Sequence, residues 1–275
     1  MKRLLAIALV CISVFSVISI SASASSGISV YIDGTKFSGG VQVKDDTTYV
    51  GIRRFATTLD PDAKVSYNYS TRTLTVKTDS LSISCKDGDY YIVVNGRYFY
   101  YDKPIYMKSG VMYAPILNLY KAFGASIKWD SKIHGFTVSK GSGKVASGES
   151  YYREDEVYWL SKIISAESRG EPLNGKIAVG NVILNRVKSS SFPNTIYGVI
   201  FDKKYGIQFS PVANGTIYDS PTAESIIAAK ICLEGYSVSN EILYFVNPKK
   251  APNSWISKNG SLITTIGNHA FYKLK

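Results

Sequence analysis

The sequence predicts an α+β protein with two domains: a duplicated β-rich module with one helix per repeat, then a mostly helical domain. Three observations support this fold class. Short alternating strands and one amphipathic helix occur twice within residues 25–140. The spacing of apolar residues becomes helical in residues 151–275. Between these parts, residues 141–150 are rich in Gly and Ser and lack periodicity, so they predict a flexible linker.

Residues 1–24 have the features of a Sec-type signal peptide. Lys2 and Arg3 precede an apolar run from Leu4, and a small-residue cleavage site at residues 22–24 follows this run directly. An uncleaved membrane anchor is the alternative. No later stretch of the sequence is long and apolar enough to span a bilayer. The mature protein is therefore expected to be exported.

Segments 49–78 and 112–140 are the two copies of the predicted repeat. Each begins with a short apolar strand, continues into an amphipathic helix, and ends with two strands joined by a polar turn. A strand and a glycine turn precede each copy, in "VYIDGTKF" and "IVVNGRYF". Because two such copies can share one core, we expect one β-rich domain over residues 25–140.

On the "DG" turn, "APILNLYKAFGASIKWD" and the strand that follows, residues 28–140 resemble the copper amine oxidase N-terminal-like domain. The resemblance implies a non-catalytic module that binds wall or glycan or acts as a spacer. It implies no copper here, because this half contains a single histidine, His134. Tyr98, Tyr100 and Tyr101 could stack on sugars, or they could simply be strand-forming residues.

The charge of the chain limits its partners. The net charge is +11, and the basic residues are spread over both halves. No run of Lys and Arg interleaves with aromatic residues, so nucleic acid is not an expected partner. An exported basic protein with 21 tyrosines suits an anionic extracellular polymer such as a cell-wall glycan. A solvated basic surface with no specific meaning is the alternative, and the sequence does not indicate an oligomeric state.

Several chemistries are excluded by what residues 151–275 lack. A zinc site needs two or three histidines, and this half has one, His269. Cys232 lies in an apolar helix, and with Cys85 it is expected to be a buried free thiol, not a nucleophile. There is no Gly-x-Ser-x-Gly motif. No metal or cofactor is therefore expected, and carboxylate chemistry, as in exported glycosidases, remains.

Two long helices are predicted at the start of this half, over 155–168 and 173–188, separated by Gly170 and Pro172. Small residues such as Gly180 permit close packing of the second helix. The elements expected after them are a short helix opened by Asn194, a long loop over 202–220, a helix from near Ser220 with Gly235 as its C-cap, a strand in "EILYFVNP", and a strand ending near His269.

Glu167 occupies an apolar position of the first helix. It follows Ile163 and Ile164 at spacings of four and three, where the pattern requires Leu or Val. A carboxyl at such a place is partly desolvated, which raises its pKa. A carboxyl still protonated near neutral pH can donate its proton to a glycosidic oxygen. The alternative is a structural glutamate paired with Arg169 or Arg186, or one that caps a neighbouring helix.

Six motifs occur across residues 155–273 in the order typical of the SleB-type spore cortex-lytic, cell wall hydrolase family, which the C-terminal half resembles. They are "SAESRGEPLNGKIAVGNVILNRV", "FPNTIYGVIF", "QFSPVANG", "LYFVNP", "SWI" and "IGNHAFYK". The resemblance implies a lysozyme-like fold and peptidoglycan glycan strands as substrate. It also implies a role in spore cortex lysis during germination, with location in the cell wall or cortex.

The resemblance also implies a mechanism. In lytic transglycosylases a Glu-Ser pair at a helix end carries the acid, and here that pair is Glu167-Ser168. The glutamate protonates the bond between N-acetylmuramic acid and N-acetylglucosamine. It then acts as base while the muramic C6 hydroxyl attacks C1, which leaves a 1,6-anhydro end. One carboxylate suffices, whereas ordinary glycosidases use two.

Further residues are assigned to substrate binding by their motifs: Ser168, Glu171, Gln208, Ser210, Tyr244, Asn247 and His269. Two of these assignments have alternatives. Glu171 could hold a helix, and His269 could be a structural hydrogen-bonding group. The leading function is thus a peptidoglycan lytic transglycosylase. The alternative is a non-catalytic wall-binding or scaffold protein that has kept the lysozyme-like fold.

Overall fold

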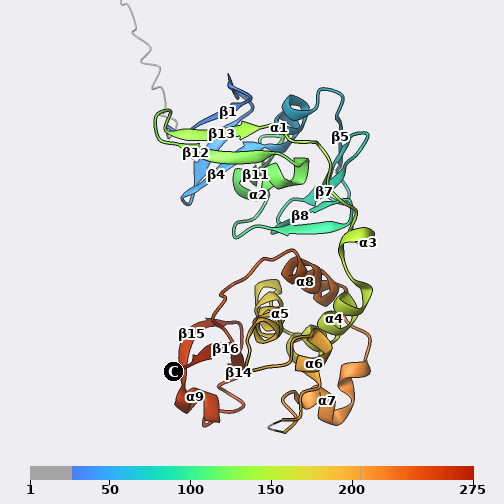
Figure 1. Ribbon diagram of the computed structural model, residues 1–275. Coiled ribbons are helices and arrows are strands. Elements are labelled where there is room, and N and C mark those ends of the chain that lie inside the picture. The colour runs from blue at the N-terminus through green and yellow to red at the C-terminus, as the bar shows by residue number, and fades with distance from the viewer. Residues whose placement is uncertain (1–26, 205) are drawn as a thin grey trace, which may run out of the picture.

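The computed structural model describes residues 27–204 and 206–275, and its two parts are shown in Figure 1. Sheets dominate the N-terminal part and helices the C-terminal part, which confirms the α+β fold class. The predicted signal peptide, residues 1–24, lies outside the described residues. None of the helices in the described part is both long and apolar enough to cross a membrane.

The N-terminal module consists of three sheets whose strands come from both predicted copies. Their orders are β12-β13-β1-β2, β10-β11-β4-β3 and β5-β6-β7-β8-β9. The strands are β1 (Ser29–Ile32), β2 (Thr35–Lys36), β3 (Val41–Lys44), β4 (Thr47–Gly51), β5 (Lys64–Asn68), β6 (Thr73–Lys77), β7 (Ser82–Lys86), β8 (Tyr91–Val94), β9 (Arg97–Tyr100), β10 (Tyr106–Lys108), β11 (Val111–Pro115), β12 (Ser126–Asp130) and β13 (Gly135–Ser139).

The two copies interlock. β13 of the second copy pairs in parallel with β1 of the first, and β11 of the second pairs antiparallel with β4 of the first. The apolar faces of all three sheets contribute to one hydrophobic cluster. The prediction that the copies share a core is therefore confirmed, and the physical reason is that neither copy alone encloses its apolar face.

The repeats differ in their helices. In the first copy, α1 (Ile52–Leu59) buries the apolar residues that the spacing predicts. In the second copy, α2 (Ile116–Leu119) and a 3₁₀ turn, η1 (Tyr120–Phe123), replace a continuous helix. Asn118 interrupts it with a φ of 100°, and its side-chain amide donates to the Tyr100 carbonyl at 3.0 Å.

The tyrosines that were candidates for sugar stacking are used for packing. Tyr101 is 1% exposed, Tyr100 is buried, and Tyr98 is half-buried. The Tyr100 ring lies 4.4 Å from that of Tyr236 in the C-terminal domain. These positions agree with the alternative interpretation, that they are strand-forming residues.

The C-terminal domain is built around α4, α5 and α8, which pack on one another beside a small sheet of order β14-β16-β15 (Figure 1). Its elements are α3 (Gly148–Tyr151), α4 (Glu154–Ser168), α5 (Leu173–Lys188), α6 (Ile196–Ile200), α7 (Ser210–Asn214), η2 (Thr216–Tyr218), α8 (Ala223–Leu233), β14 (Tyr244–Val246), α9 (Trp255–Asn259), β15 (Gly260–Ile266) and β16 (His269–Leu274). The two long helices match the predicted ranges within one residue.

Smaller elements depart from the expectation. Thr195, not Asn194, caps α6, because its hydroxyl accepts from the Gly198 amide at 3.0 Å. The predicted loop over 202–220 contains α7 and η2. The last predicted strand is a hairpin, β15–β16, which turns at Gly267 with a φ of +58°.

The two cysteines of the described chain are buried free thiols, as predicted. Burial raises the pKa of Cys85 to about 12, and it also raises the pKa of Cys232. Neither thiol is therefore a nucleophile at neutral pH.

Gly180 lies where α5 meets α4 and α8. A Cβ atom there would be 2.7 Å from Cys232 Sγ and 2.9 Å from Ile164 Cδ1. We expect Gly180→Ala to lower the free energy of unfolding by about 1 kcal/mol, since overpacking by about 1–3 kcal/mol exceeds the gain in helix propensity of about 1 kcal/mol. Denaturant titration measures it, with Gly170→Ala, whose Cβ would enter open space, as control. An unchanged midpoint for Gly180→Ala would contradict this packing.

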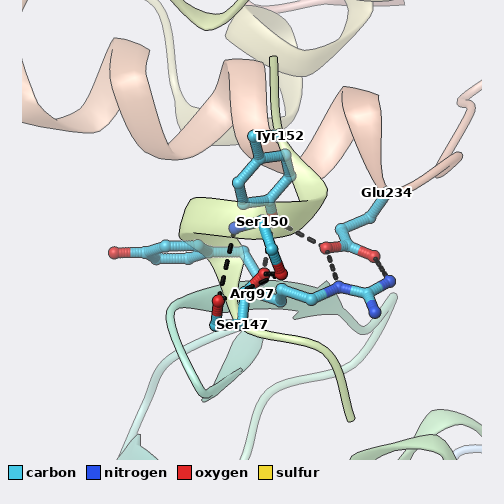
Figure 2. A network of polar contacts seen from close by, with 6 residues as sticks. Arg97, Ser147, Ser150, Tyr152 and Glu234 are labelled. Carbon is cyan, nitrogen blue, oxygen red and sulfur yellow. Dashed lines mark hydrogen bonds and ion pairs between the residues drawn. The ribbon is translucent and has the colours of Figure 1, made fainter. Parts of the chain in front are cut away.

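A buried ion pair joins the two domains (Figure 2). Arg97 on β9 donates from Nε and Nη2 to both carboxylate oxygens of Glu234, just after α8, at 2.8 and 2.7 Å. The Tyr152 hydroxyl donates to the same carboxylate at 2.6 Å and accepts from the Tyr98 amide at 3.2 Å. The side chains of Arg97 and Glu234 are only 14% and 5% exposed, so this contact is an internal part of the fold.

The predicted linker also contacts the N-terminal module. The Gly148 amide donates to the Asn95 carbonyl at 2.7 Å, and the Asn95 side chain donates to the Val145 carbonyl at 2.9 Å. A Cβ at Gly148 would lie 2.6 Å from the Gly96 carbonyl oxygen. Composition predicts flexibility here, but these contacts hold the segment against the module. The exact boundary at 141–150 stays a prediction.

Candidate active site

Glu167 lies in the last turn of α4. The two preceding positions of its helix face, Ile163 and Ile164, are fully buried, and Glu167 itself is half-buried. Its carboxyl is therefore placed at the rim of the hydrophobic core, as the periodicity predicts.

No ion pair or hydrogen bond holds the Glu167 side chain among the described residues. Arg169 donates instead to the Ser220 carbonyl at 3.4 Å, and Arg186 donates to the Leu243 carbonyl at 2.8 Å. The alternative of a glutamate paired with either arginine is thus not what the fold contains. Burial without a partner raises the pKa of Glu167 to about 7.

Glu171 has the opposite environment. Its carboxylate accepts hydrogen bonds from the Asn268 backbone amide at 2.8 Å and from the Asn268 side-chain amide at 3.0 Å. Burial by itself raises the pKa of Glu171, but these two bonds outweigh it, with help from His269 and Lys176, and leave the pKa below its usual value. Glu171 is therefore ionised at a pH where Glu167 is half protonated, so of the two carboxyls only Glu167 can donate a proton near neutral pH.

Glu171 also organises its surroundings. Lys176 donates to its backbone carbonyl and pairs with Glu224 at 2.7 Å. A Cβ at Gly267 would collide with the Glu171 carboxylate, so the hairpin turn closes directly on this side chain. These contacts support the structural alternative for Glu171, as the link between the α4–α5 turn and the β15–β16 hairpin. Substrate binding by Glu171 stays a prediction.

Ser168 and His269 are both buried. The Ser168 hydroxyl donates to the Ile164 carbonyl at 2.5 Å, within α4. His269 is 7% exposed, its ring lies 5.2 Å from that of Phe245, and its Nδ1 has no partner among the described residues. Burial lowers the pKa of His269, so the ring is neutral at neutral pH. Both positions favour structural roles over direct contact with a glycan.

The remaining predicted residues come from two segments. Gln208 donates to the Gly206 carbonyl at 3.0 Å, and Ser210 is exposed at the start of α7. Tyr244 is half-buried on β14, and the Asn247 side chain accepts from two backbone amides of the following turn. Nothing in the sequence pattern alone relates these two segments.

Arg186 brings those segments together, and no pattern in the sequence predicted this role. It is 5% exposed, and its guanidinium carbon lies 5.0–5.2 Å from the ring centroids of Phe192, Phe209 and Tyr244. Burial lowers its pKa to about 10, and Nη1 has no partner in the described residues. Arg186 thereby holds Phe209, which lies between Gln208 and Ser210, next to Tyr244. Its sequence signal was a charged side chain within a helix rich in apolar residues.

Each half of the chain matches the model of a known protein family. Residues 170–272 match the family model of the cell wall hydrolases. This region is a cell wall hydrolase domain. Residues 31–138 match the model of the copper amine oxidase N-terminal domain. The predicted acid, Glu167, lies just before the region matched by the cell wall hydrolase model.

Curated relatives of the cell wall hydrolase domain carry the name spore cortex-lytic enzyme. The one from Bacillus cereus is 39% identical over 122 residues, 44% of this chain and 46% of the relative. The one from Bacillus subtilis is 37% identical over 120 residues, 44% of this chain and 38% of the relative. The chain thus spans less than half the length of these relatives.

A solved structure also matches. The catalytic domain of the germination-specific lytic transglycosylase SleB from Bacillus anthracis is 38% identical, with a TM-score of 0.41. The match covers 47% of this chain and all of that one.

The pKa of Glu167 predicts how a reaction that uses this carboxyl as its acid depends on pH. The carboxyl must be protonated to act as acid, and its pKa in the fold is about 7. The protonated fraction is therefore full well below pH 7 and falls about tenfold per pH unit above it. We expect the initial rate of glycan cleavage to fall above pH 7 in the same way. A rate that stays flat from pH 6 to 9 would exclude Glu167 as the acid.

Proposed function

We propose that this chain is an exported enzyme that degrades peptidoglycan as a lytic transglycosylase. The observation that carries the proposal is Glu167, a half-buried carboxyl without a partner among the described residues, at a helix end beside a cell wall hydrolase domain. Its pKa of about 7 leaves it able both to donate and to accept a proton at neutral pH.

The reaction follows from a single such carboxyl. Glu167 donates its proton to the oxygen that links N-acetylmuramic acid to N-acetylglucosamine, and the C1–O bond breaks. The carboxylate then accepts the proton of the muramic C6 hydroxyl as that oxygen bonds to C1. The products are a 1,6-anhydromuramic end and a new N-acetylglucosamine end, and Glu167 is protonated again.

The environment of Glu171 supports this route over two-carboxylate hydrolysis. A second catalytic carboxylate would need access to the sugar or to water. Glu171 is buried and its oxygens are bonded to Asn268. Substrate contacts are assigned instead to Gln208, Ser210 and Tyr244, which Arg186 holds in place, and to Asn247.

The names of the relatives support action in the wall or spore cortex, in germination. The test digests cortex and vegetative peptidoglycan with the full chain and identifies the products by mass spectrometry. Anhydromuramic ends are expected. New reducing ends would instead mean a muramidase or glucosaminidase. Unchanged glycans from both sources would mean a non-catalytic wall-binding or scaffold protein.

A further inference from the structure

A second site of potential function lies in the N-terminal module, outside the domain that contains Glu167. It is a cavity of about 550 Å³ between α1 and the β5–β6 and β10–β11 hairpins. We call it the arginine–tyrosine pocket, after the residues of its lining that matter here: Arg53, Arg54, Tyr67, Tyr69 and Arg72.

The pocket has an excess of positive charge. Its lining contains one acidic residue, Asp87, and this carboxylate is already used. One oxygen accepts from Arg72, and the other accepts from the Met107 amide at 3.0 Å. The charges of Arg53 and Arg54 are therefore left uncompensated within the pocket.

The two arginines of α1 differ in how they are held. Arg53 donates one Nη1 hydrogen bond to the Val65 carbonyl at 2.9 Å, which orients its guanidinium along β5. The guanidinium of Arg54 forms no ion pair or hydrogen bond with any residue of 27–204 or 206–275; only its backbone carbonyl accepts, from Thr58 and Thr57. Planar guanidinium groups with free donors match carboxylates in geometry as well as in charge.

An aromatic pair borders these charges. The rings of Tyr67 and Tyr69 meet edge to face, with centroids 4.9 Å apart. Tyr69 is 86% exposed, and no other large hydrophobic residue of the described chain is as exposed. An amphipathic ring held open to solvent at a pocket is suited to pack on a sugar face. Tyr69 thus has the exposure that Tyr98, Tyr100 and Tyr101 lack, while the half-buried Tyr67 supports its ring.

The backbone conformation of Arg72 also supports a pocket that presents guanidinium groups to a ligand. It has a φ of 55°, in the left-handed region that an arginine rarely adopts and that Gly or Asn adopts at less cost. Its side chain remains 62% exposed while it pairs with Asp87. The turn therefore places a third guanidinium at the mouth of the pocket.

The position of the pocket leaves it free of the domain interface. β5 is one edge of the five-stranded sheet, and β9, the opposite edge, packs on α8 (Figure 1). Four strand spacings separate these edges, roughly 19 Å. The Arg97–Glu234 pair holds β9 to the catalytic domain, so the pocket and Glu167 belong to one connected body.

We propose that the arginine–tyrosine pocket binds carboxylate-bearing glycan, namely peptidoglycan whose peptide carboxylates meet the arginines while a sugar packs on Tyr69. The choice of peptidoglycan rests on the proposed function. Charge complementarity supports this occupant. Bound there, a strand is anchored at a second point while another part is cut at Glu167.

The test measures binding of the full chain to insoluble peptidoglycan freed of teichoic acid. The chain carries Glu167→Gln, so that the glycan is not cut during the measurement. We expect Arg53→Ala/Arg54→Ala and Tyr69→Ala each to weaken binding by about tenfold or more, since each removes charge-assisted bonds or the sugar platform. We also expect amidation of the wall carboxylates to weaken binding of the parent but to change binding of the double arginine variant little.

Matched controls lie on another sheet of the same module. Lys128→Ala/Lys132→Ala removes two exposed charges, and Trp129→Ala removes an aromatic ring that is 48% exposed. Both controls should bind like the parent. Equal loss in the lysine variant would show diffuse attraction of a basic protein and overturn the proposal. The proposal would also be overturned if the parent bound wall that keeps its teichoic acid but failed to bind wall freed of it.

A last measurement separates this proposal from that of catalysis. In the chain with Glu167 intact, the pocket variants should cleave short soluble glycan fragments at the parent rate and insoluble wall more slowly. If neither the parent nor the variants cleave either substrate, the proposed lytic transglycosylase activity is wrong, but the binding result still stands. If soluble fragments are also cleaved more slowly by the pocket variants, the pocket is not a separate site.

Discussion

Replacement of Glu167 by glutamine is expected to lower the rate of glycan cleavage by about 10²-fold or more, because the amide cannot donate and recover a proton. Shape and most hydrogen-bonding capacity are kept, so the variant should fold and still bind peptidoglycan. Release of anhydro-muropeptides from the same amount of wall measures the effect.

Glu171→Gln is the matched control. Its carboxylate holds the hairpin turn through Asn268, so this change should cost stability more than rate. Thermal melts of both variants distinguish the two effects. If Glu167→Gln stayed active while Glu171→Gln were folded but inactive, the acid would have been assigned to the wrong carboxylate. If neither change affected cleavage, the glycosidase hypothesis would fail as well.

Stability offers an independent check on Glu167. Its pKa in the fold is about 7, raised from 4.5 by burial. A group with a raised pKa contributes its full share of stability below the unfolded pKa and loses it as the pH rises through the folded one. At pH 8 the wild type therefore contains a half-buried charge that Glu167→Gln lacks. We expect the variant to melt higher than the wild type at pH 8 and near the same temperature at pH 4.

Breaking the pair between the domains is the second large effect. Arg97→Met should lower the free energy of unfolding by about 3 kcal/mol, since it leaves the buried Glu234 carboxylate with Tyr152 as its only side-chain partner among the described residues. Because this pair joins β9 to α8, we also expect one calorimetric transition for the wild type and two for the variant. Differential scanning calorimetry measures both changes.

Two further variants test this interpretation. Arg153→Met removes an exposed pair with Asp155 and should leave the transition where it is. The double change Arg97→Met/Glu234→Met removes both charges and should recover much of the lost stability, as apolar replacements of buried pairs do. If Arg97→Met melted like the wild type, the domains would be held together by other contacts.

The local features of this chain were accessible from sequence because their causes lie within one or two turns. The 173–188 helix was predicted over the range that α5 has, from apolar spacing and the break at Gly170 and Pro172. The same spacing placed Glu167 on the core face of α4 and predicted its raised pKa. The duplication predicted a shared core, since each copy leaves its apolar face open.

The tertiary structure alone decided the features that depend on partners distant in sequence. Arg97 and Glu234 are separated by 137 positions, so no periodicity relates them. Composition predicted a flexible linker, but a close approach of Gly96 and Gly148 holds it. Glu171 is an acceptor for a turn 97 residues away, and that contact separates its pKa from that of Glu167. Sequence spacing determines which face of an element is apolar, whereas the partner of a buried charge is determined by how those faces pack.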